Sequence, residues 1–273
     1  MQPFDELRRV EVRRGGVTLS CLAGGAAGAP PVVLLHGLAG AAEELRPTAE
    51  ALAPRHRVVV PDQRGHGRST RRPADVSRRA YAADAAAVVE HLCGGRPAAL
   101  VGQSMGGHTA MLVAAWYPRL VSRLVMLEAG VGGTAPGDED YPARLGRWFA
   151  SWPVPFADRE SAAAHLGGTP TARALAADLD ETPDGLRPRF DADVMEAAIA
   201  PVAAEARWAE WSSIAAPTLL VRGERGTVPA DEDARMRAER PEVHHTVIAG
   251  AGHDAHLDAP AAWQALLASY LSS

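Results

Sequence analysis

One serine of this sequence lies in a setting that favours nucleophilic chemistry. Ser104 is the centre of the pentapeptide Gly-Gln-Ser-Met-Gly at residues 102–106, which follows the apolar run 98–101 and opens a predicted helix. A serine at such a strand-to-helix turn exposes its hydroxyl, and the turn is so tight that the flanking positions must be small. This context favours a nucleophilic role for Ser104 over a structural one.

A serine hydroxyl is a poor nucleophile until a base removes its proton, so the serine needs a partner. His253 is the best candidate because the stretch Gly-Ala-Gly at 250–252 precedes it and lets its backbone approach a site closely. His36 and His66 come earlier in the chain than the serine. His256 lies three residues beyond His253 and is the real competitor.

Alternating strand and helix patterns predict the elements that position these residues. Two segments at the start, 7–13 and 17–23, have the pattern of an antiparallel strand pair around a Gly-Gly turn. Largely apolar runs predict the strands of a mainly parallel sheet at 32–35, 57–60, 98–101, 123–127, 218–221 and 243–248. Helices are predicted at 43–53, 77–92, 105–116, 231–240 and 261–271. The predicted fold class is α/β, with a mostly parallel, doubly wound sheet.

The alternation breaks between residues 131 and 213. This stretch is rich in proline, including Pro136, and holds large aromatic side chains such as Trp148 and Trp152. A loop of this length inside a compact domain is improbable, so we predict a helical cap inserted after the sixth strand. The predicted division is a core domain of residues 1–130 and 214–273 and a cap of residues 131–213.

Bulk properties limit the classes of function. The net charge is −5 without a block of like charge, which argues against a nucleic-acid surface. There is no lysine, so a Schiff-base lysine is excluded. Cys21 and Cys93 lie in apolar surroundings and are predicted to be buried hydrophobes rather than a disulfide or a metal site. No secretory signal or membrane span is recognised, so the expected location is the cytoplasm.

Four motifs together resemble the α/β-hydrolase fold superfamily. They are VLLHG at 33–37, DQRGHGRS at 62–69, the Ser104 pentapeptide and GAGH at 250–253. The resemblance covers nearly the whole chain except the predicted cap. It implies two backbone N–H donors for a tetrahedral oxyanion, those of Leu38 and Met105. It also implies that Arg64 and His66 fix the loop after the fourth strand rather than take part in catalysis.

The acid that should orient the histidine is missing from the place where the resemblance puts it. Members of the superfamily usually carry an aspartate after the seventh predicted strand, where this chain has Gly226 or Thr227. Glu128 ends the preceding predicted core strand, and that end of a strand faces the ligand crevice in such a sheet. Certain haloalkane dehalogenases place their acid there. We therefore predict Glu128 as the acid, with Glu224 and Asp231 as alternatives.

Together these residues predict a serine hydrolase that cleaves a carboxylic ester, lactone or thioester through an acyl-enzyme, with the triad Ser104, His253 and Glu128. The aromatic residues favour an apolar acyl or aryl group, and the candidate pocket residues are His36, Trp148 and Trp152. We expect no metal, organic cofactor, nucleic acid or membrane, a small-molecule substrate, and a monomer or homodimer. Alternatives on the same site are an acyltransferase, a C–C bond hydrolase or a perhydrolase. The alternative without catalysis is a ligand-binding protein on a hydrolase scaffold.

Overall fold

The computed structural model describes residues 5–134 and 137–272. Residues 1–4 and 273 of the predicted core domain lie outside the described residues, as do residues 135 and 136 of the predicted cap, with Pro136. Across the described ranges, no helix has both the length and the apolar character needed to cross a membrane.

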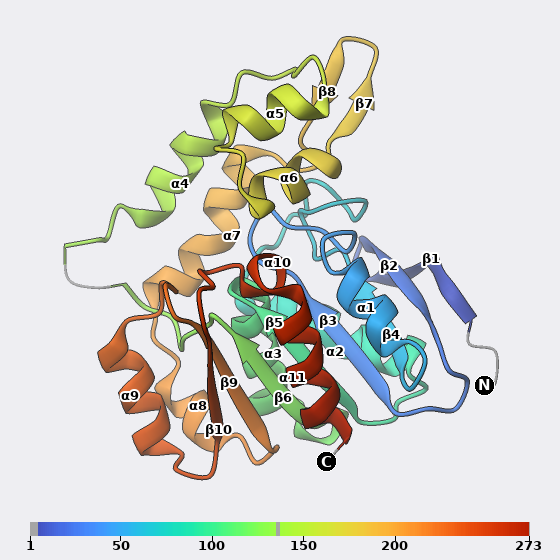
Figure 1. The fold of residues 1–273 in the computed structure, drawn as a ribbon, viewed down its shortest axis with the longest axis vertical. Helices are drawn as coiled ribbons and strands as arrows, with labels where there is room; N and C mark the ends of the chain where they lie inside the picture. The colour runs from blue at the N-terminus through green and yellow to red at the C-terminus, as the bar shows by residue number, and fades with distance from the viewer. Residues whose placement is uncertain (1–4, 135–136, 273) are drawn as a thin grey trace.

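An eight-stranded sheet forms the centre of the described structure, in the order β1-β2-β4-β3-β5-β6-β9-β10 (Figure 1). Its strands are β1 Asp5–Arg14, β2 Val17–Gly25, β3 Pro31–Leu35, β4 Arg57–Pro61, β5 Ala98–Gln103, β6 Val121–Leu127, β9 Thr218–Gly223 and β10 His244–Ile248. β2 is antiparallel to both β1 and β4, and all other neighbours are parallel. The predicted α/β class with a mostly parallel, doubly wound sheet is confirmed.

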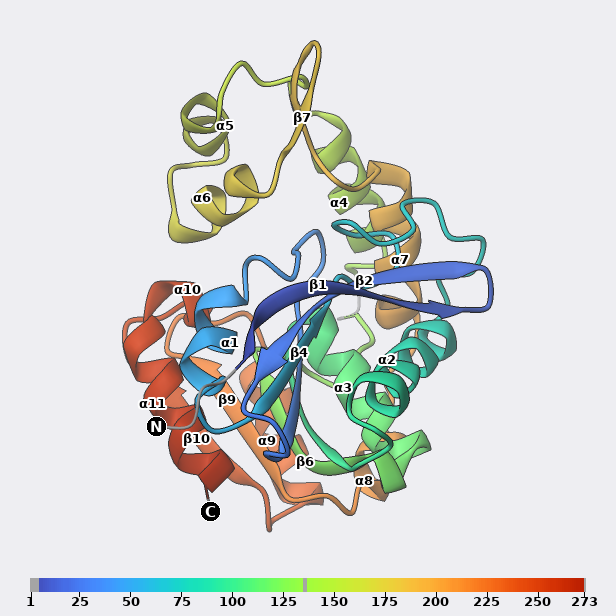
Figure 2. The same ribbon diagram turned by 90° about the vertical axis from the view of Figure 1, so that its right-hand side faces the viewer.

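Helices cover both faces of this sheet, as Figures 1 and 2 show. One face carries α2 (Arg78–Leu92), α3 (Met105–Trp116) and α8 (Trp208–Ser213), and the other carries α1 (Arg46–Leu52) and α11 (Pro260–Ser272). Each face buries its own apolar cluster, and each large side chain in it contributes about 1.5–3 kcal/mol by leaving water. The other elements of the core are the 3-10 helix Pro118–Leu120, α9 (Ala230–Glu239) and α10 (Ala255–Asp258).

The chain that follows Glu128 and precedes β9, residues 129–217, is called the insertion below. Before α8 it contains α4 (Tyr141–Ala150), α5 (Arg159–His165), α6 (Pro170–Ala177), the hairpin of β7 (Asp180–Thr182) and β8 (Gly185–Arg187), and α7 (Ala192–Ala204). These elements lie beyond one end of the sheet (Figure 2) and bury a cluster around Phe149, Trp152, Phe156 and Phe190. The insertion is mainly helical, as predicted, but the sequence pattern gave no sign of the hairpin.

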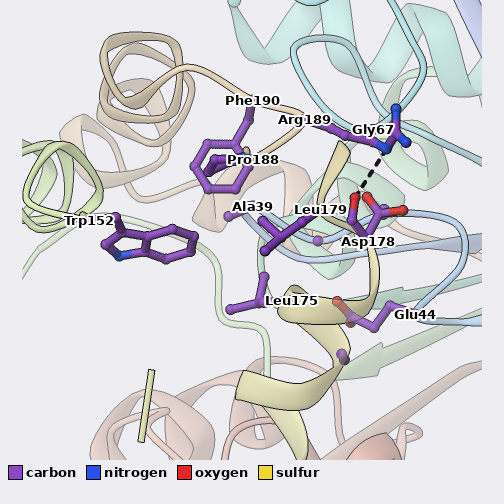
Figure 3. Close-up of a pocket in the computed structure, with 13 residues that line it drawn as sticks. Ala39, Glu44, Gly67, Trp152, Leu175, Asp178, Leu179, Pro188, Arg189 and Phe190 are labelled. Carbon is purple, nitrogen blue, oxygen red and sulfur yellow. Dashed lines mark hydrogen bonds between the residues drawn. The ribbon is translucent and has the colours of Figure 1, made fainter. Parts of the chain in front are cut away.

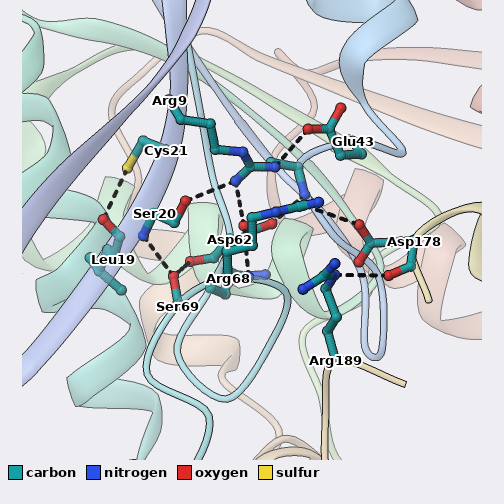
Figure 4. Close-up of polar contacts among 12 residues, drawn as sticks. Arg9, Leu19, Ser20, Cys21, Glu43, Asp62, Arg68, Ser69, Asp178 and Arg189 are labelled. Atoms are coloured by element: carbon teal, nitrogen blue, oxygen red, sulfur yellow. Dashed lines mark hydrogen bonds and ion pairs between the residues drawn. The ribbon is translucent and has the colours of Figure 1, made fainter. Parts of the chain in front are cut away.

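The loop after β4 is held by the buried carboxylate of Asp62 (Figure 4). Its Oδ1 accepts a hydrogen bond from the N–H of Ala42 at 2.7 Å. Its Oδ2 accepts from Arg9 Nη1 at 2.6 Å and from the N–H of Arg68 at 3.0 Å. Further along this loop, Arg64 forms two hydrogen bonds of 2.7 Å with the carboxylate of Asp84. The loop is therefore fixed by buried charge pairs, which are the stronger class of hydrogen bond.

Replacement of Asp62 by asparagine tests this role. Asp62→Asn keeps the size of the side chain but removes the charge that Arg9 and the loop N–H groups bind. We expect the free energy of unfolding to fall by about 1–3 kcal/mol, measured by urea denaturation. The matched control is Glu11→Gln, whose ion pair with Arg13 is exposed, and it should change stability by less than about 0.5 kcal/mol. An Asp62→Asn variant as stable as the unchanged protein would contradict this account.

Candidate active site

The turn between β5 and α3 places Ser104 in a conformation that few residues adopt. Its φ is 51° and its ψ is −121°, so a non-glycine residue lies in a strained region of backbone space. A Cβ at Gly106 would come within 2.2 Å of the Leu35 carbonyl oxygen, and a Cβ at Gly102 within 2.2 Å of the Gly106 oxygen. The predicted requirement for small residues around the serine therefore has a direct steric cause.

The side chain of Gln103 connects this turn to the loop that carries His253. Its Nε2 donates to the His253 carbonyl oxygen at 3.2 Å and to Asp254 Oδ1 at 3.0 Å. Ser104 and the histidine loop are therefore neighbours in space, although 149 positions separate Ser104 and His253 in the sequence. Among the described residues, Ser104 Oγ has no hydrogen-bond partner, and catalytic hydrogen bonds of this kind often tighten only when substrate binds.

Glu128 follows β6 directly, and its carboxylate turns into the protein. The side chain is buried, and the residue has a φ of 47°, which is again rare outside glycine. Oε1 accepts a hydrogen bond from the N–H of Gly223, and Oε2 accepts one from the N–H of Thr227, both at 2.8 Å. Oε2 also lies 3.5 Å from Nδ1 of His253. Glu128 is therefore held by two backbone donors beside the predicted base.

Gly226, in the loop after β9, leaves room for the side chain of Glu128, which comes from the end of β6. A Cβ at residue 226 would lie 2.1 Å from Oε1 of Glu128, so the carboxylate fills the space that a side chain at 226 would need. This is the loop where the resemblance led us to expect an aspartate. The position of the Glu128 carboxylate therefore requires a residue without a side chain at 226.

Thr227 lies closer to the histidine than the carboxylate does. Its Oγ1 is 2.8 Å from Nδ1 of His253, so the hydroxyl and the Glu128 carboxylate share this side of the ring. Sequence reasoning set Thr227 aside because a hydroxyl carries no charge, and it missed Gln103 and Asp254 altogether. Only their positions next to Ser104 and His253 in the sequence pointed to them.

The charges around His253 favour its protonated form. Burial alone would lower the pKa of His253, but the hydrogen bond with Glu128 and the charges of Asp254, Glu128 and Glu44 raise it above its ordinary value. Burial alone would raise the pKa of Glu128, yet His253 and the N–H groups of Thr227 and Gly223 lower it. The pair therefore stabilises an imidazolium next to an ionised carboxylate.

The rival residues have other partners. His256 Nε2 lies 2.8 Å from Oε1 of Glu44, and His66 Nδ1 lies 2.9 Å from the Arg64 carbonyl oxygen. Glu224 accepts from the N–H of Gly250, whereas Asp231 is exposed in the first turn of α9. Within the described ranges, Glu128 is the carboxylate paired with Nδ1 of His253, and neither Glu224 nor Asp231 reaches it.

The predicted oxyanion donors lie on both sides of the nucleophile. Met105 opens α3 directly after Ser104, so its N–H belongs to the unpaired N-terminal turn of that helix. The loop of Leu38 packs against the serine, because a Cβ at Gly37 would lie 3.4 Å from Ser104 Cβ. Leu38 and Met105 therefore both lie beside Ser104, which is compatible with the predicted role of their N–H groups as oxyanion donors.

A small cavity separates the insertion from the core near this loop, and Figure 3 shows its lining residues. Trp152 lines it together with Ala39, Leu175 and Phe190. Trp148 packs edge-on against Trp152 but is 47% exposed. The ring of His36 is fully buried, with Nδ1 2.7 Å from the Gly37 carbonyl oxygen and Nε2 accepting from the N–H of Gln63 at 2.9 Å. Of the three predicted pocket residues, Trp152 lines this cavity, whereas Trp148 and His36 do not.

Moving the carboxylate from residue 128 to residue 226 tests whether the two positions depend on each other. Gly226→Asp alone adds a side chain where the Glu128 carboxylate lies, so we expect ester turnover to fall by about 100-fold or more. The double variant Glu128→Gly/Gly226→Asp removes the clash and supplies a carboxylate from the loop after β9. It should recover at least about tenfold in kcat relative to Glu128→Gly alone. Additive losses in the double variant would show that the two positions are independent.

Comparisons with known proteins agree with this architecture. The sequence matches the alpha/beta hydrolase fold family over residues 30–260. It is 42% identical to the sn-1-specific diacylglycerol lipase ABHD11 of Mus musculus over 110 residues, which are 40% of this chain and only 35% of that protein. It is 28% identical to the 2-(acetamidomethylene)succinate hydrolase of Mesorhizobium japonicum over 266 residues, which cover 90% of this chain and 88% of that protein.

Solved structures share the whole fold. The crystal structure of E-2-(acetamidomethylene)succinate hydrolase superposes with a TM-score of 0.86 at 24% identity, over 98% of this chain and 100% of that one. The thioesterase domain from the curacin biosynthetic pathway superposes with a TM-score of 0.80, also at 24% identity, over 97% and 100% of the two chains. Since the family match spans most of the sequence, this chain belongs to the α/β-hydrolase fold family.

Proposed function

We propose that this protein is a serine hydrolase that cleaves a carboxylic ester, a lactone or a thioester with an apolar acyl or aryl part. The observation that carries the proposal is the 3.5 Å contact between the buried Glu128 carboxylate and Nδ1 of His253, on the loop that Gln103 holds beside Ser104. A carboxylate at this place keeps the proton on Nδ1, which leaves Nε2 free to act as the base.

The reaction has two steps. Ser104 Oγ attacks the substrate carbonyl while His253 Nε2 takes the hydroxyl proton, and the resulting oxyanion accepts hydrogen bonds from the N–H groups of Leu38 and Met105. The tetrahedral intermediate collapses, the bond to the leaving group breaks, and His253 returns the proton to that group. Water then gives a proton to His253 and attacks the acyl-enzyme, which releases the acid and restores the serine. This chemistry requires no metal or organic cofactor.

The insertion acts in this proposal as a cap that covers the acyl or aryl part of the substrate. The aromatic cluster around Trp152 supports this role, as does the cavity between that cluster and the core. The predicted cap of residues 131–213, with a core of 1–130 and 214–273, stays a proposal except at the end of the cap. Trp211 is fully buried in the core cluster, which favours an end of the cap before α8.

The relative that matches along nearly its whole length is named for a succinate derivative, which favours a small substrate for this chain as well. We propose a cytoplasmic monomer or homodimer that acts on such a molecule without nucleic acid or a membrane. The dispersed charges of the sequence support this setting.

Replacement of the nucleophile tests the proposal. Ser104→Ala should reduce 4-nitrophenyl ester turnover by about 10⁴-fold or more, because no acyl-enzyme can form. A fluorophosphonate probe should label the unchanged protein rapidly and leave Ser104→Ala unlabelled, measured by intact-protein mass spectrometry. The matched control is Ser151→Ala, an exposed serine of the insertion, which should keep full turnover and labelling. Turnover in Ser104→Ala close to that of the control would refute the assignment, and an unlabelled, inactive parent protein would favour a ligand-binding role.

A further inference from the structure

Among the described residues, one buried arginine has no acidic partner. Four arginines are buried, namely Arg64, Arg78, Arg222 and Arg240. Three of them pair with a carboxylate: Arg64 with Asp84 at 2.7 Å, Arg222 with Asp233 at 2.8 Å, and Arg240 with Glu242 at 2.9 Å. Among the residues that the structure describes, no carboxylate pairs with Arg78, although it is only 2% exposed. Burying a charge without an opposite charge lowers the stability of the folded protein, which suggests that Arg78 has a functional role.

The hydrogen bonds of Arg78 are also incomplete. Nη2 donates to the carbonyl oxygen of Met105 at 3.3 Å and to the hydroxyl of Thr109. Within the described part of the chain, Nε and Nη1 are buried and have no acceptor. The guanidinium carbon lies 4.6 Å from the centre of the Tyr81 ring, which offers a π face but no charge. Donors therefore remain available for an anion.

The surrounding charges make this place electropositive. Burial lowers the pKa of Arg78 to about 10, and the nearby positive charge of Arg207 acts in the same direction. The side chain therefore stays protonated at neutral pH. Burial lowers the pKa of His108 well below its ordinary value, and the positive charges of Arg78 and Arg207 act in the same direction.

The location of Arg78 links this charge to the proposed chemistry. Met105, whose carbonyl oxygen it binds, follows the proposed nucleophile directly. The side chains of Tyr81 and Met105 form one apolar cluster with Ala198 and Ile199 of α7. Leu38 packs at the partly exposed edge of this cluster. The guanidinium thus contacts Met105 and Tyr81, two members of the cluster in which the core packs against α7.

We propose that Arg78 binds a carboxylate of the substrate, so that the preferred substrate is an ester whose apolar part ends in a carboxylate. This inference rests on the proposed ester hydrolysis and adds the charge of the substrate to it. The apolar cluster receives the carbon chain, and the free N–H groups of Arg78 bind the terminal anion. A substrate carboxylate replaces the acidic side chain that the other buried arginines have.

A matched pair of esters tests this preference. Mono(4-nitrophenyl) glutarate carries a free carboxylate on its acyl part, and its methyl ester is the neutral counterpart. We expect the unchanged protein to favour the acid over the methyl ester by about 10- to 100-fold in kcat/KM. Arg78→Met should lower kcat/KM for the acid by about tenfold or more and so remove this preference. Arg79→Met is the matched control, since Arg79 is the exposed next residue of α2, and it should keep the preference.

Two further measurements separate this inference from the proposed hydrolysis. Glutarate should bind to Ser104→Ala at least about tenfold more tightly than to Ser104→Ala/Arg78→Met in calorimetric titrations, whether or not esters are cleaved. The melting temperature of Arg78→Met should equal or exceed that of the unchanged protein, because an uncompensated buried charge is lost. The inference is overturned by equal glutarate binding in the two variants, by equal losses for both esters, or by an unfolded Arg78→Met protein, which would mark Arg78 as structural. Failure of the hydrolysis proposal would appear separately, as absent labelling of Ser104.

Discussion

The site depends on the way one carboxylate is packed. Glu128 leaves the end of β6 with a positive φ and fills the space beside Gly226, where two N–H groups and His253 surround its oxygens. Desolvation opposes an ionised carboxylate here, and these three donors outweigh it. The same contacts fix the loop after β9 against the end of β6. The place of the proposed acid, the shape of that loop and the orientation of the proposed base therefore all depend on the packing of this carboxylate.

Other contacts hold the neighbouring loops and the insertion to this centre. Asp254 receives Gln103 of the serine turn through one oxygen, at 3.0 Å, and Thr171 of α6 through the other, at 2.7 Å. Glu44 holds His256, which joins the loop before α1 to the segment after His253. Asp254 thus connects the turn of Ser104, the loop of His253 and α6. A displacement of α6 would therefore also move the loop of His253.

Sequence patterns predicted the core well because buried parallel strands and the tight serine turn leave strong local signals. They also led to Glu128, since a charged residue at the end of an apolar strand needs a partner. They gave no sign of the hairpin of β7 and β8, whose strands are too short to show a period. They also could not reveal that no carboxylate in the described part of the chain pairs with Arg78, because this depends on how α2 packs against the neighbouring elements. His36 was predicted as a pocket residue, and both nitrogens of its ring contact backbone groups, the carbonyl of Gly37 and the N–H of Gln63.

The most direct test of Glu128 as the proposed acid is the pKa of His253, measured by NMR titration of its imidazole. The spectrum of a His253→Asn variant assigns the signal among the ten histidines. We predict that the pKa of His253 in the unchanged protein lies above its ordinary value, because the hydrogen bond with Glu128 and the charges of Asp254, Glu128 and Glu44 together outweigh burial. In Glu128→Gln the pKa should fall, since burial is then less opposed, and in Thr227→Val it should stay raised because the carboxylate remains. An unchanged pKa in Glu128→Gln, or loss of the rise in Thr227→Val, would contradict the assignment of Glu128 as the acid.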